Sequence, residues 1–424
     1  MKFTKMSLVA ALLVGSSAFA IDNVKVSGDA KLYYATDDAK KDGIGNAVSR
    51  GDDSLFAAGS SAGQAALGLG VTADLAKGIS AGAHVTVLTT LGLQGQLVNN
   101  VWEQTNVVTD SYIVDEAWLA ATLGKTTVKI GRMELDTPIV FSEKWSIIAN
   151  TFEAAVVINQ DIPDTTLVGA YVGGSNSQAV GGTGGGIGGV INKTASESTF
   201  SQFYKGAYAA GVINNSFKPL VAQAWYYNAS TDEVVGANNL DGVEAYWLQA
   251  DLSMEGVMAG AQYTDLKLQL NSGTLEVNTN AYAVMLGYEG MKDLFTAKVS
   301  YSSVDKDHSA AFNLAGTGQS KLYTEAWWNY GSVTAADTDS FNVTITSPVN
   351  GMFDLGVYYT DANQDAATGN GDMTEITVTA SKTVGPLDAT LAFINTSDDS
   401  KNIPTGGTTG DDFNTIQAYL TLNF

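Results

Sequence analysis

Short stretches in which apolar and polar residues alternate recur along almost the whole chain. In the first of them, Val24, Val26 and Leu32 fall on one face, whereas Lys25 and Ser27 fall on the other. A period of two is typical of a β-strand with one apolar face. Eighteen such strands are predicted, at residues 24–34, 65–75, 79–91, 112–123, 127–133, 152–159, 165–172, 204–213, 220–229, 243–254, 257–268, 279–288, 294–304, 340–346, 353–360, 374–383, 387–396 and 413–424. The pattern therefore predicts an all-β fold.

The length and spacing of these strands favour a barrel in a membrane. A tilted strand needs ~9–11 residues to cross a hydrocarbon core, and the predicted strands are about that long. Short and long connections alternate along the chain, as in bacterial barrels, which have even strand numbers. We therefore predict a closed antiparallel transmembrane β-barrel of eighteen strands, with sixteen as the alternative, rather than a soluble sandwich. No linker divides residues 21–424, so a single barrel domain is expected.

Aromatic residues and prolines agree with this prediction. Aromatic residues gather near the predicted strand ends, where barrels carry interfacial girdles. They are Tyr33, Tyr34, Tyr112, Trp225, Tyr226, Tyr227, Tyr246, Trp247, Tyr358, Tyr359 and Phe424. Proline cannot donate to a sheet ladder, so prolines are expected only in connections. The six prolines are Pro138, Pro163, Pro219, Pro348, Pro386 and Pro404.

The two ends of the chain predict export. Lys2 and Lys5 precede an apolar run, Leu8–Val14, and Ala18-Phe19-Ala20 forms a small-x-small cleavage site. Residues 1–20 are therefore predicted to be a secretory signal peptide. The last strand ends on Phe424, which resembles the sorting signal that barrel-insertion machinery reads in outer-membrane proteins. Location in a bacterial outer membrane is expected.

Composition excludes several classes of function. The chain has no cysteine, so neither disulfides nor thiolate metal sites can form. Its formal charge is −22, and without Lys2 and Lys5 the remaining 20 basic and 44 acidic residues give −24. This balance disfavours nucleic-acid binding, which needs clustered Lys and Arg. An acidic pore would instead concentrate cations, although part of the excess serves to keep loops soluble.

Catalytic and phosphate-binding motifs are weak. The segment Gly181–Gly189 is Gly-rich, but it lacks the Gly-Lys-Ser/Thr ending of a phosphate loop, so a flexible outer loop is expected. His84 and His308 are the only histidines, and they lie on distant elements. A Ser/His/Asp constellation therefore has little support. His84 falls on a Gly/Ser/Thr-rich face and is predicted to face the lumen.

One long connection has the composition of a pore constriction. The segment between strands 127–133 and 152–159 is apolar enough to fold back inside a barrel, and it carries charges of both signs. The candidate constriction residues are Arg132, Glu134, Asp136, Glu143 and Lys144. A loop of residues 134–151 in the lumen would narrow the pore and select solutes by size and charge. The alternative is a surface loop with solvated charges.

Five charged residues within predicted strands fall on the polar face. They are Glu116, Lys129, Glu153, Asp251 and Lys298. On the lipid face such charges would cost ~2–4 kcal/mol at the midplane, so we expect them to line the pore. Lining alone does not establish selectivity. A bulge at Gly131 would change the face on which Arg132 lies.

Three segments resemble porins of the OprD-like kind. They are Glu116–Pro138, Asn150–Gly173 and Lys321–Gly331. More narrowly, they are similar to the major porins of ε-proteobacteria. The resemblance implies an outer-membrane barrel, often a trimer, in which Gly131-Arg132 through Asp136 opens the constriction loop. The chain departs from relatives with a ladder of basic residues, since Arg50 and Arg132 are its only arginines, so a stacked arginine track for carboxylate substrates is not expected.

These features together predict a Gram-negative outer-membrane porin rather than an enzyme. Ions and small hydrophilic solutes would diffuse passively through its lumen with weak cation preference. Outer-membrane lipid, the insertion machinery and further copies in a homotrimer are the expected partners, without nucleic acid. No cofactor is expected, although Ca²⁺ bound by carboxylates is left open. A surface adhesin or structural barrel with a plugged lumen is the alternative, and an outer-membrane hydrolase is a second one.

Overall fold

The computed structural model describes most of the chain. The described residues are 21–38, 54–89, 91, 100–101, 104–105, 111–144, 147–176, 201–235, 240–270, 275–290, 294–316, 318–365, 371–398 and 411–424. The predicted leader, the Gly-rich segment Gly181–Gly189 and Pro404 lie outside them. No helix in the described part is long and apolar enough to cross a membrane.

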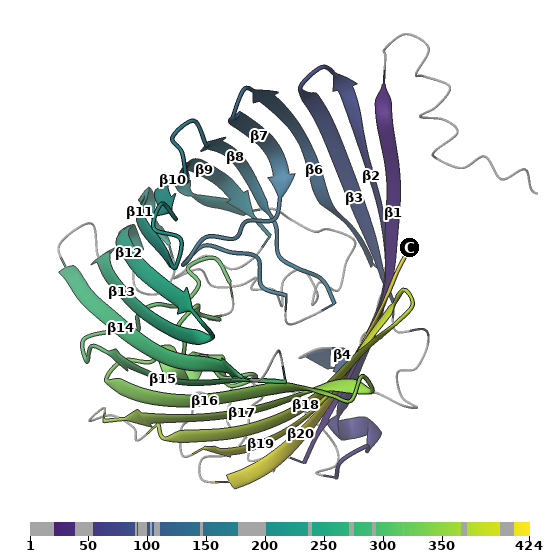
Figure 1. The fold of residues 1–424 in the computed structure, drawn as a ribbon, viewed down its shortest axis with the longest axis vertical. Helices are drawn as coiled ribbons and strands as arrows, with labels where there is room; N and C mark the ends of the chain where they lie inside the picture. Colours follow the sequence, from purple (N-terminus) through teal and green to yellow (C-terminus); the bar gives the residue numbers. More distant parts are fainter. Residues whose placement is uncertain are drawn as a thin grey trace, which may run out of the picture.

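The described strands form one antiparallel barrel (Figure 1). Of the 20 strands in the sheet, β4 (Asn100–Val101) and β5 (Gln104–Thr105) are two-residue strands outside the wall, which leaves eighteen. The wall strands are β1 (Asp22–Asp37), β2 (Ser61–Ala76), β3 (Ile79–Thr89), β6 (Ser111–Leu123), β7 (Thr126–Met133), β8 (Phe152–Asn159), β9 (Thr165–Ser175), β10 (Ser201–Asn214), β11 (Leu220–Val235), β12 (Leu240–Met254), β13 (Val257–Leu270), β14 (Leu275–Gly290), β15 (Phe295–Val304), β16 (Thr338–Val349), β17 (Phe353–Gln364), β18 (Met373–Val384), β19 (Leu387–Asp398) and β20 (Asp411–Asn423). The prediction of an eighteen-stranded barrel is confirmed.

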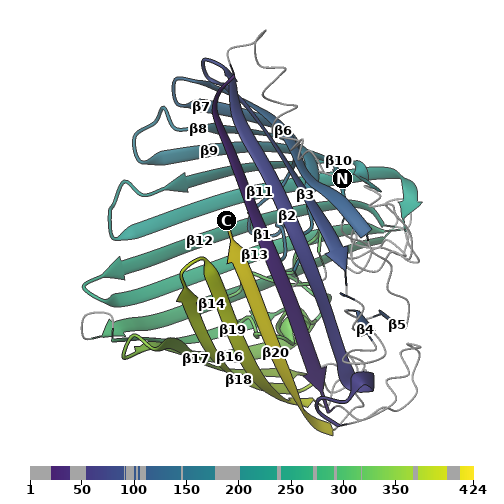
Figure 2. The ribbon, with the colours of Figure 1, turned by 90° about the vertical axis from the view of Figure 1, so that its right-hand side faces the viewer.

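The first and last strands close the wall. β1 pairs with β20 from Asp29↔Asn423 to Asp37↔Thr415, and Figure 2 shows the two strands side by side. Beyond this ladder, the Gly28 amide donates to the Phe424 carbonyl at 2.7 Å, and the Phe424 amide donates back at 2.9 Å. The terminal aromatic residue is thus part of the seam. A closed wall leaves no edge strand, which a sheet in lipid requires.

Alternation along each strand separates an apolar exterior from a polar interior. On the outer face, Leu69 is 52% exposed and Leu286 is 63% exposed. On the inner face, Gln262, Ser302 and Thr377 are buried. This arrangement is the reverse of a soluble sandwich, which would turn its apolar face inward. It is the arrangement that a barrel surrounded by hydrocarbon requires.

The short connections are tight turns. Between β12 and β13, Glu255 and Gly256 have φ of 52° and 83°, and between β16 and β17, Asn350 and Gly351 have φ of 47° and 68°. Two consecutive residues at positive φ match the right-handed twist of paired strands. These turns lie at one end of the barrel, and the strand ends that lead into the long connections lie at the other.

Two details differ from the expectation. Pro348 lies inside β16 rather than in a connection, where it pairs with Asp354 next to the turn. Because this is the second-last position of the strand, one missing donor does not interrupt the ladder beyond it. The run Trp225-Tyr226-Tyr227 also does not form a girdle as a whole. Tyr226 faces outward, whereas its two neighbours are buried inside, because successive side chains take opposite faces.

Candidate pore constriction

The loop of residues 134–151, between β7 and β8, enters the barrel (Figure 1). Its first turn is held by hydrogen bonds from the Ser142 amide to the Leu135 carbonyl at 2.8 Å and from the Thr137 amide to the Val140 carbonyl at 3.2 Å. Ile139 and Ile148 are each 2% exposed, which indicates packing against the wall rather than solvation. The structure thus favours the inward fold over the alternative of a surface loop.

A second connection, residues 305–337 between β15 and β16, also packs inside the barrel. Ala310, Ala315 and Val333 are completely buried, and the short helix η3 (Tyr330–Thr334) belongs to this loop. The alternation pattern predicts only a long connection between two strands here. Its signal was the apolar run Ala310–Ala315, which has no strand alternation and is unusual for a solvated connection.

Hydrogen bonds join the two loops. The Phe141 amide donates to Asn313 Oδ1 at 3.2 Å, and Asn313 Nδ2 donates to the Phe141 carbonyl at 2.9 Å. The Leu314 amide donates to the Ile139 carbonyl at 2.9 Å. We call these residues, together with Asn150, the loop joint, because Asn150 Nδ2 donates to the Ala315 carbonyl at 3.1 Å. The two loops therefore form one body inside the barrel.

Two carboxyl groups lie beside the loop joint, of which Glu143 is buried and Glu325 is half-buried. Glu143 is 1% exposed and accepts hydrogen bonds from Asn313 Nδ2 at 3.0 Å and from the Gln319 amide at 3.3 Å. Burial raises the pKa of Glu325 to about 8; the charge on Glu143 adds to the rise, while hydrogen bonds from Ser320 oppose it. The Glu325 carboxyl therefore keeps its proton to a higher pH than an exposed carboxyl does.

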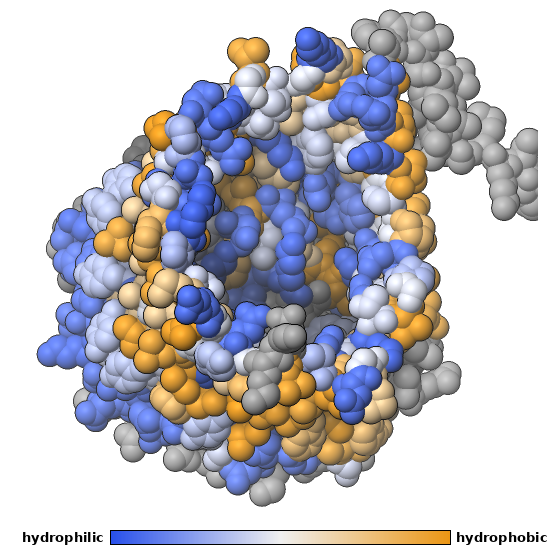
Figure 3. Space-filling view, viewed as in Figure 1, coloured by the Kyte–Doolittle hydropathy of each residue, from blue (hydrophilic) through white to orange (hydrophobic). Residues whose placement is uncertain are grey.

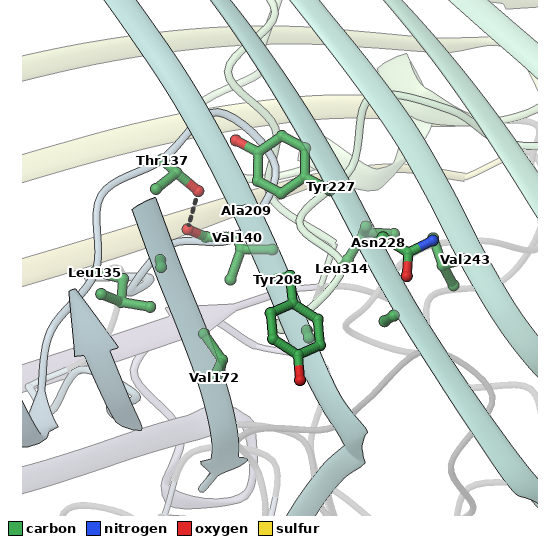
Figure 4. A pocket seen from close by; sticks show the side chains of 13 residues that line it. Leu135, Thr137, Val140, Val172, Tyr208, Ala209, Tyr227, Asn228, Val243 and Leu314 are labelled. Carbon is green, nitrogen blue, oxygen red and sulfur yellow. Dashed lines mark hydrogen bonds between the residues drawn. The ribbon is translucent and has the colours of Figure 1, made fainter. Parts of the chain in front are cut away.

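An apolar seat holds the joined loops against one side of the wall (Figure 4). It is formed by Leu135 and Val140 of the first loop, Leu314 of the second, and wall residues Val172, Tyr227 and Val243. The remaining cavity is only about 30 Å³, roughly the space of one water molecule. Thr137 Oγ1 donates to the Val140 carbonyl at 2.6 Å, as drawn in the figure.

A charged cavity of about 400 Å³ remains on the opposite side of the loops. It is lined by Asp29, Lys31, Leu32, His84, Thr86, Asp115, Glu116, Glu134, Lys144, Ile147, Ile148, Ala149, Thr151, Tyr419, Leu420 and Thr421. These residues come from β1, β3, β6, β20 and the first loop. Figure 3 shows the barrel hollowed at its centre, with hydrophilic residues around much of the opening.

Most predicted site residues lie on the inner side. Glu134 and Lys144 line the charged cavity and form an ion pair at 2.5 Å. Asp136 pairs with Lys321 of the second loop. Neither Asp136 nor Glu143 lines the cavity, because Asp136 is 88% exposed and Glu143 is buried in the loop body.

The wall residues expected at the lumen divide into two groups. Glu116 lines the charged cavity, and Lys129 Nζ lies 4.3 Å from the centre of the Trp118 ring. Asp251 Oδ1 accepts from the Tyr323 hydroxyl at 2.5 Å, which ties the second loop to β12. Lys298 alternates with outward-facing residues of β15 and so faces inward.

Arg132 and Glu153 lie on the other face. Arg132 pairs with Ala117, two residues from the exposed Leu119, and Glu153 pairs with Arg132 across β7 and β8. Their side chains form an ion pair at 2.9 Å near the long-loop end of the wall. Gly131 has φ of 120°, but the register from β6 to β7 is unbroken, so it does not turn Arg132 inward. This placement differs from the expectation for both residues.

The bulge lies instead at Asp115. The register jumps from His84↔Glu116 to Val85↔Val114, which leaves Asp115 without a partner opposite it. Both Asp115 and Glu116 consequently line the cavity. Sequence alternation assigns only one of two adjacent residues to the lumen, so Asp115 was missed. Within the described residues, no group of three or more His, Asp or Glu is arranged to hold a metal ion, which gives the Ca²⁺ expectation no support.

Comparison with known proteins gives matches in structure only. No family model and no curated protein sequence matches the chain. Pseudomonas aeruginosa OpdK with vanillate matches with a TM-score of 0.68 at 12% identity, covering 95% of this chain and 99% of that one. OccK8 (OprE) gives 0.65 at 13% over 95% and 98%, and OpdQ gives 0.65 at 14% over 95% and 97%, both from the same species. The chain has the fold of an OprD-like porin. At these identities the likeness establishes the fold.

Proposed function

We propose that this chain is an outer-membrane porin through which ions and small hydrophilic solutes diffuse down their gradients. The observation that carries the proposal is the charged cavity of about 400 Å³, enclosed by an apolar-out wall and narrowed by two inward loops. A wall with an apolar exterior suits a bilayer, and a polar interior suits water. Size selection would come from the loops and charge selection from the cavity lining.

A weak preference for cations is part of the proposal. Four carboxylates line the cavity, and two lysines oppose them. The carboxylates are Asp29, Asp115, Glu116 and Glu134, and the lysines are Lys31 and Lys144. A narrow region with net negative charge concentrates cations and excludes anions. Vanillate, with which OpdK was crystallised, is a carboxylate, and this lining does not favour a solute of that kind.

The proposal includes the route to the membrane and the assembly. We infer export by the leader of residues 1–20, insertion guided by the terminal strand that ends on Phe424, kinship with the major porins of ε-proteobacteria, and a homotrimeric state. The seam between Gly28 and Phe424 supports a role of the last residue in closing the barrel. N-terminal sequencing of the purified protein tests the leader, and light scattering in detergent tests the trimer.

Conductance in a planar bilayer tests the proposed function. Purified protein is expected to give discrete channels. In a KCl gradient, the reversal potential should have the same sign as the equilibrium potential of potassium. An anion-selective potential would contradict the cation preference alone. Absence of channels would contradict the porin assignment and would favour the adhesin or structural barrel with a plugged lumen.

A further inference from the structure

His84 reaches across a neighbouring strand to face the charged cavity. It lies on β3, and its ring lies over Gly68 and Gly70 of β2. A Cβ at Gly68 would lie 2.8 Å from the ring atoms Cε1 and Nε2, and a Cβ at Gly70 would lie 3.0 Å from Cδ2. Real Cβ atoms essentially never come as close as 2.8 Å, and 3.0 Å is tighter than nine in ten of their contacts. The two glycines therefore open the space through which the imidazole reaches β1.

Both ring nitrogens of His84 face carboxylates. Nδ1 lies 2.7 Å and 2.8 Å from the two carboxylate oxygens of Asp115 on β6, and Nε2 lies 3.6 Å from Asp29 Oδ2 on β1. An ionised carboxylate only accepts hydrogen bonds, and a neutral imidazole donates from one nitrogen only. An imidazole with carboxylates at both nitrogens is therefore satisfied when it is doubly protonated. Thr86 Oγ1 donates to Asp115 Oδ2 at 2.8 Å and completes the cluster.

The protonated ring changes the charge of the cavity lining. With a neutral imidazole, four carboxylates and two lysines give a net charge of −2, and with an imidazolium they give −1. Lys31 lies 3.2 Å from Asp29, and Lys144 pairs with Glu134, so each lysine already has a partner. Among the described residues, His84 is the only cationic group within ion-pair distance of Asp115. The bulged carboxylate is therefore neutralised by His84 alone.

We propose that His84 is a specificity-determining residue of the pore, an imidazolium that halves the net negative charge of the charged cavity and so limits its preference for cations. The inference rests on the proposed function of a diffusion channel. The charged groups that face this ring are Asp29 and Lys31 from β1, Asp115 and Glu116 from β6, and Glu134 and Lys144 from the first loop. Replacing His84 by a neutral residue removes one positive charge and leaves every carboxylate of the lining in place.

The test is the reversal potential of H84Q in a KCl gradient. Glutamine is polar and of similar length but carries no charge, so the ratio of potassium to chloride permeability is expected to rise about twofold, in proportion to the change in net charge. D115N is expected to shift the ratio in the opposite direction. The matched control is H308Q, because His308 lies in the second loop and does not line the cavity; it should behave as the wild type does.

Side-chain NMR of H308Q gives a second readout, since His84 is then the only histidine in the chain. Imidazolium chemical shifts at neutral pH support the inference, and shifts of a neutral tautomer overturn it. A conducting wild type whose permeability ratio is unchanged in H84Q also overturns the inference but leaves the proposed function intact. A wild type that does not conduct overturns both.

Discussion

The inner face of the barrel is apolar on one side of the lumen and charged on the other, although both sides consist of the same kind of alternating strand. On one side, β9 to β12 present Val172, Tyr227, Trp247 and other apolar residues to the loops. On the other, β1, β3 and β6 present Asp29, His84 and further charged groups to water. A polar inner face was expected all round the barrel. The difference teaches that alternation fixes which side chains face inward, while the identity of those side chains decides where a loop will settle.

The apolar seat explains why two long loops can be ordered inside the barrel. Ordering a residue costs about 1–2 kcal/mol of backbone entropy, which solvated loops cannot recover. Fully burying a Leu, Ile or Phe side chain returns about 1.5–3 kcal/mol. Ile139, Leu314 and Leu322 are each at most 5% exposed. On the other side, Ile147 and Ile148 of the first loop pack with Tyr33 and Ile113 of the wall, and the charged residues beside them line the cavity.

The largest expected effect comes from breaking the apolar seat. L314D would place a carboxylate at a position that is 5% exposed and surrounded by apolar residues. An unpaired buried charge costs several kcal/mol, so the loops are expected to leave the wall. Single-channel recording should then show a severalfold larger and noisier conductance. L314M keeps the volume and should conduct as the wild type does; an unchanged L314D channel would mean that the seat does not hold the loops.

Alkaline pH should destabilise the two joined loops, because Glu325 loses its proton. The folded pKa of about 8 lies above the ordinary value of 4.5, so the folded state holds the proton more strongly than the unfolded one. This contribution to stability is therefore fully present below pH 4.5 and is lost as the pH rises through about 8. Thermal unfolding followed by circular dichroism should show a lower Tm at pH 9 than at pH 6. E325Q should flatten this dependence, and a dependence that persists in E325Q would assign it elsewhere.

Cutting the loop joint should have an intermediate effect. N313A removes the side chain that bonds both the Phe141 backbone and Glu143, and it leaves these buried groups without those partners. Each such loss costs about 1–3 kcal/mol. We expect a lower Tm and more frequent current fluctuations at unchanged ion selectivity. N278A, at an exposed side chain of β14, is the control; equal behaviour of the two variants would show that the joint is not a structural link.

The smallest effect is expected for the exposed ion pair between the loops. Lys321 bonds Asp136, whose side chain is 88% exposed. Exposed pairs contribute about 0–1 kcal/mol, since solvent screens them. K321A should therefore change Tm by no more than a degree or two. If K321A lowers Tm as much as N313A does, the main link between the loops is the exposed ion pair and not the buried loop joint.

The sequence predicted the strands of the wall better than the loops and side chains inside the barrel. Eighteen strands could be found because each one alternates over enough residues to cross a bilayer. The face of a single residue was less secure, since the bulge at Asp115 leaves no mark in the pattern and Gly131, which looked like one, does not shift the register. Arg132 and Glu153 were assigned to the lumen because they are charged, whereas the inner residues next to them are the buried, apolar Met133 and Phe152.

The second loop was missed for a different reason. Residues 305–337 contain buried groups whose partners lie far away in the chain, such as Asn313 with Phe141 and the Trp327 amide with Glu375. A connection between strands has no periodic pattern from which its position could be predicted. Its apolar run indicates packing inside the barrel only when the apolar residues on the inner face of the wall are known. That loops 134–151 and 305–337 form one body becomes evident only from the structure, in which both pack on the apolar seat.

The most direct test of the central claim is chemical access to the charged cavity during conduction. The chain has no cysteine, so A149C provides a single thiol on the cavity lining. We predict that a charged methanethiosulfonate added to an open A149C channel lowers its current in discrete steps. The current of A310C should stay unchanged, because Ala310 is fully buried in the hydrophobic cluster that includes the apolar seat. If the reagent modifies the A149C protein and the current does not change, the account is contradicted, because ions would then not pass through this cavity.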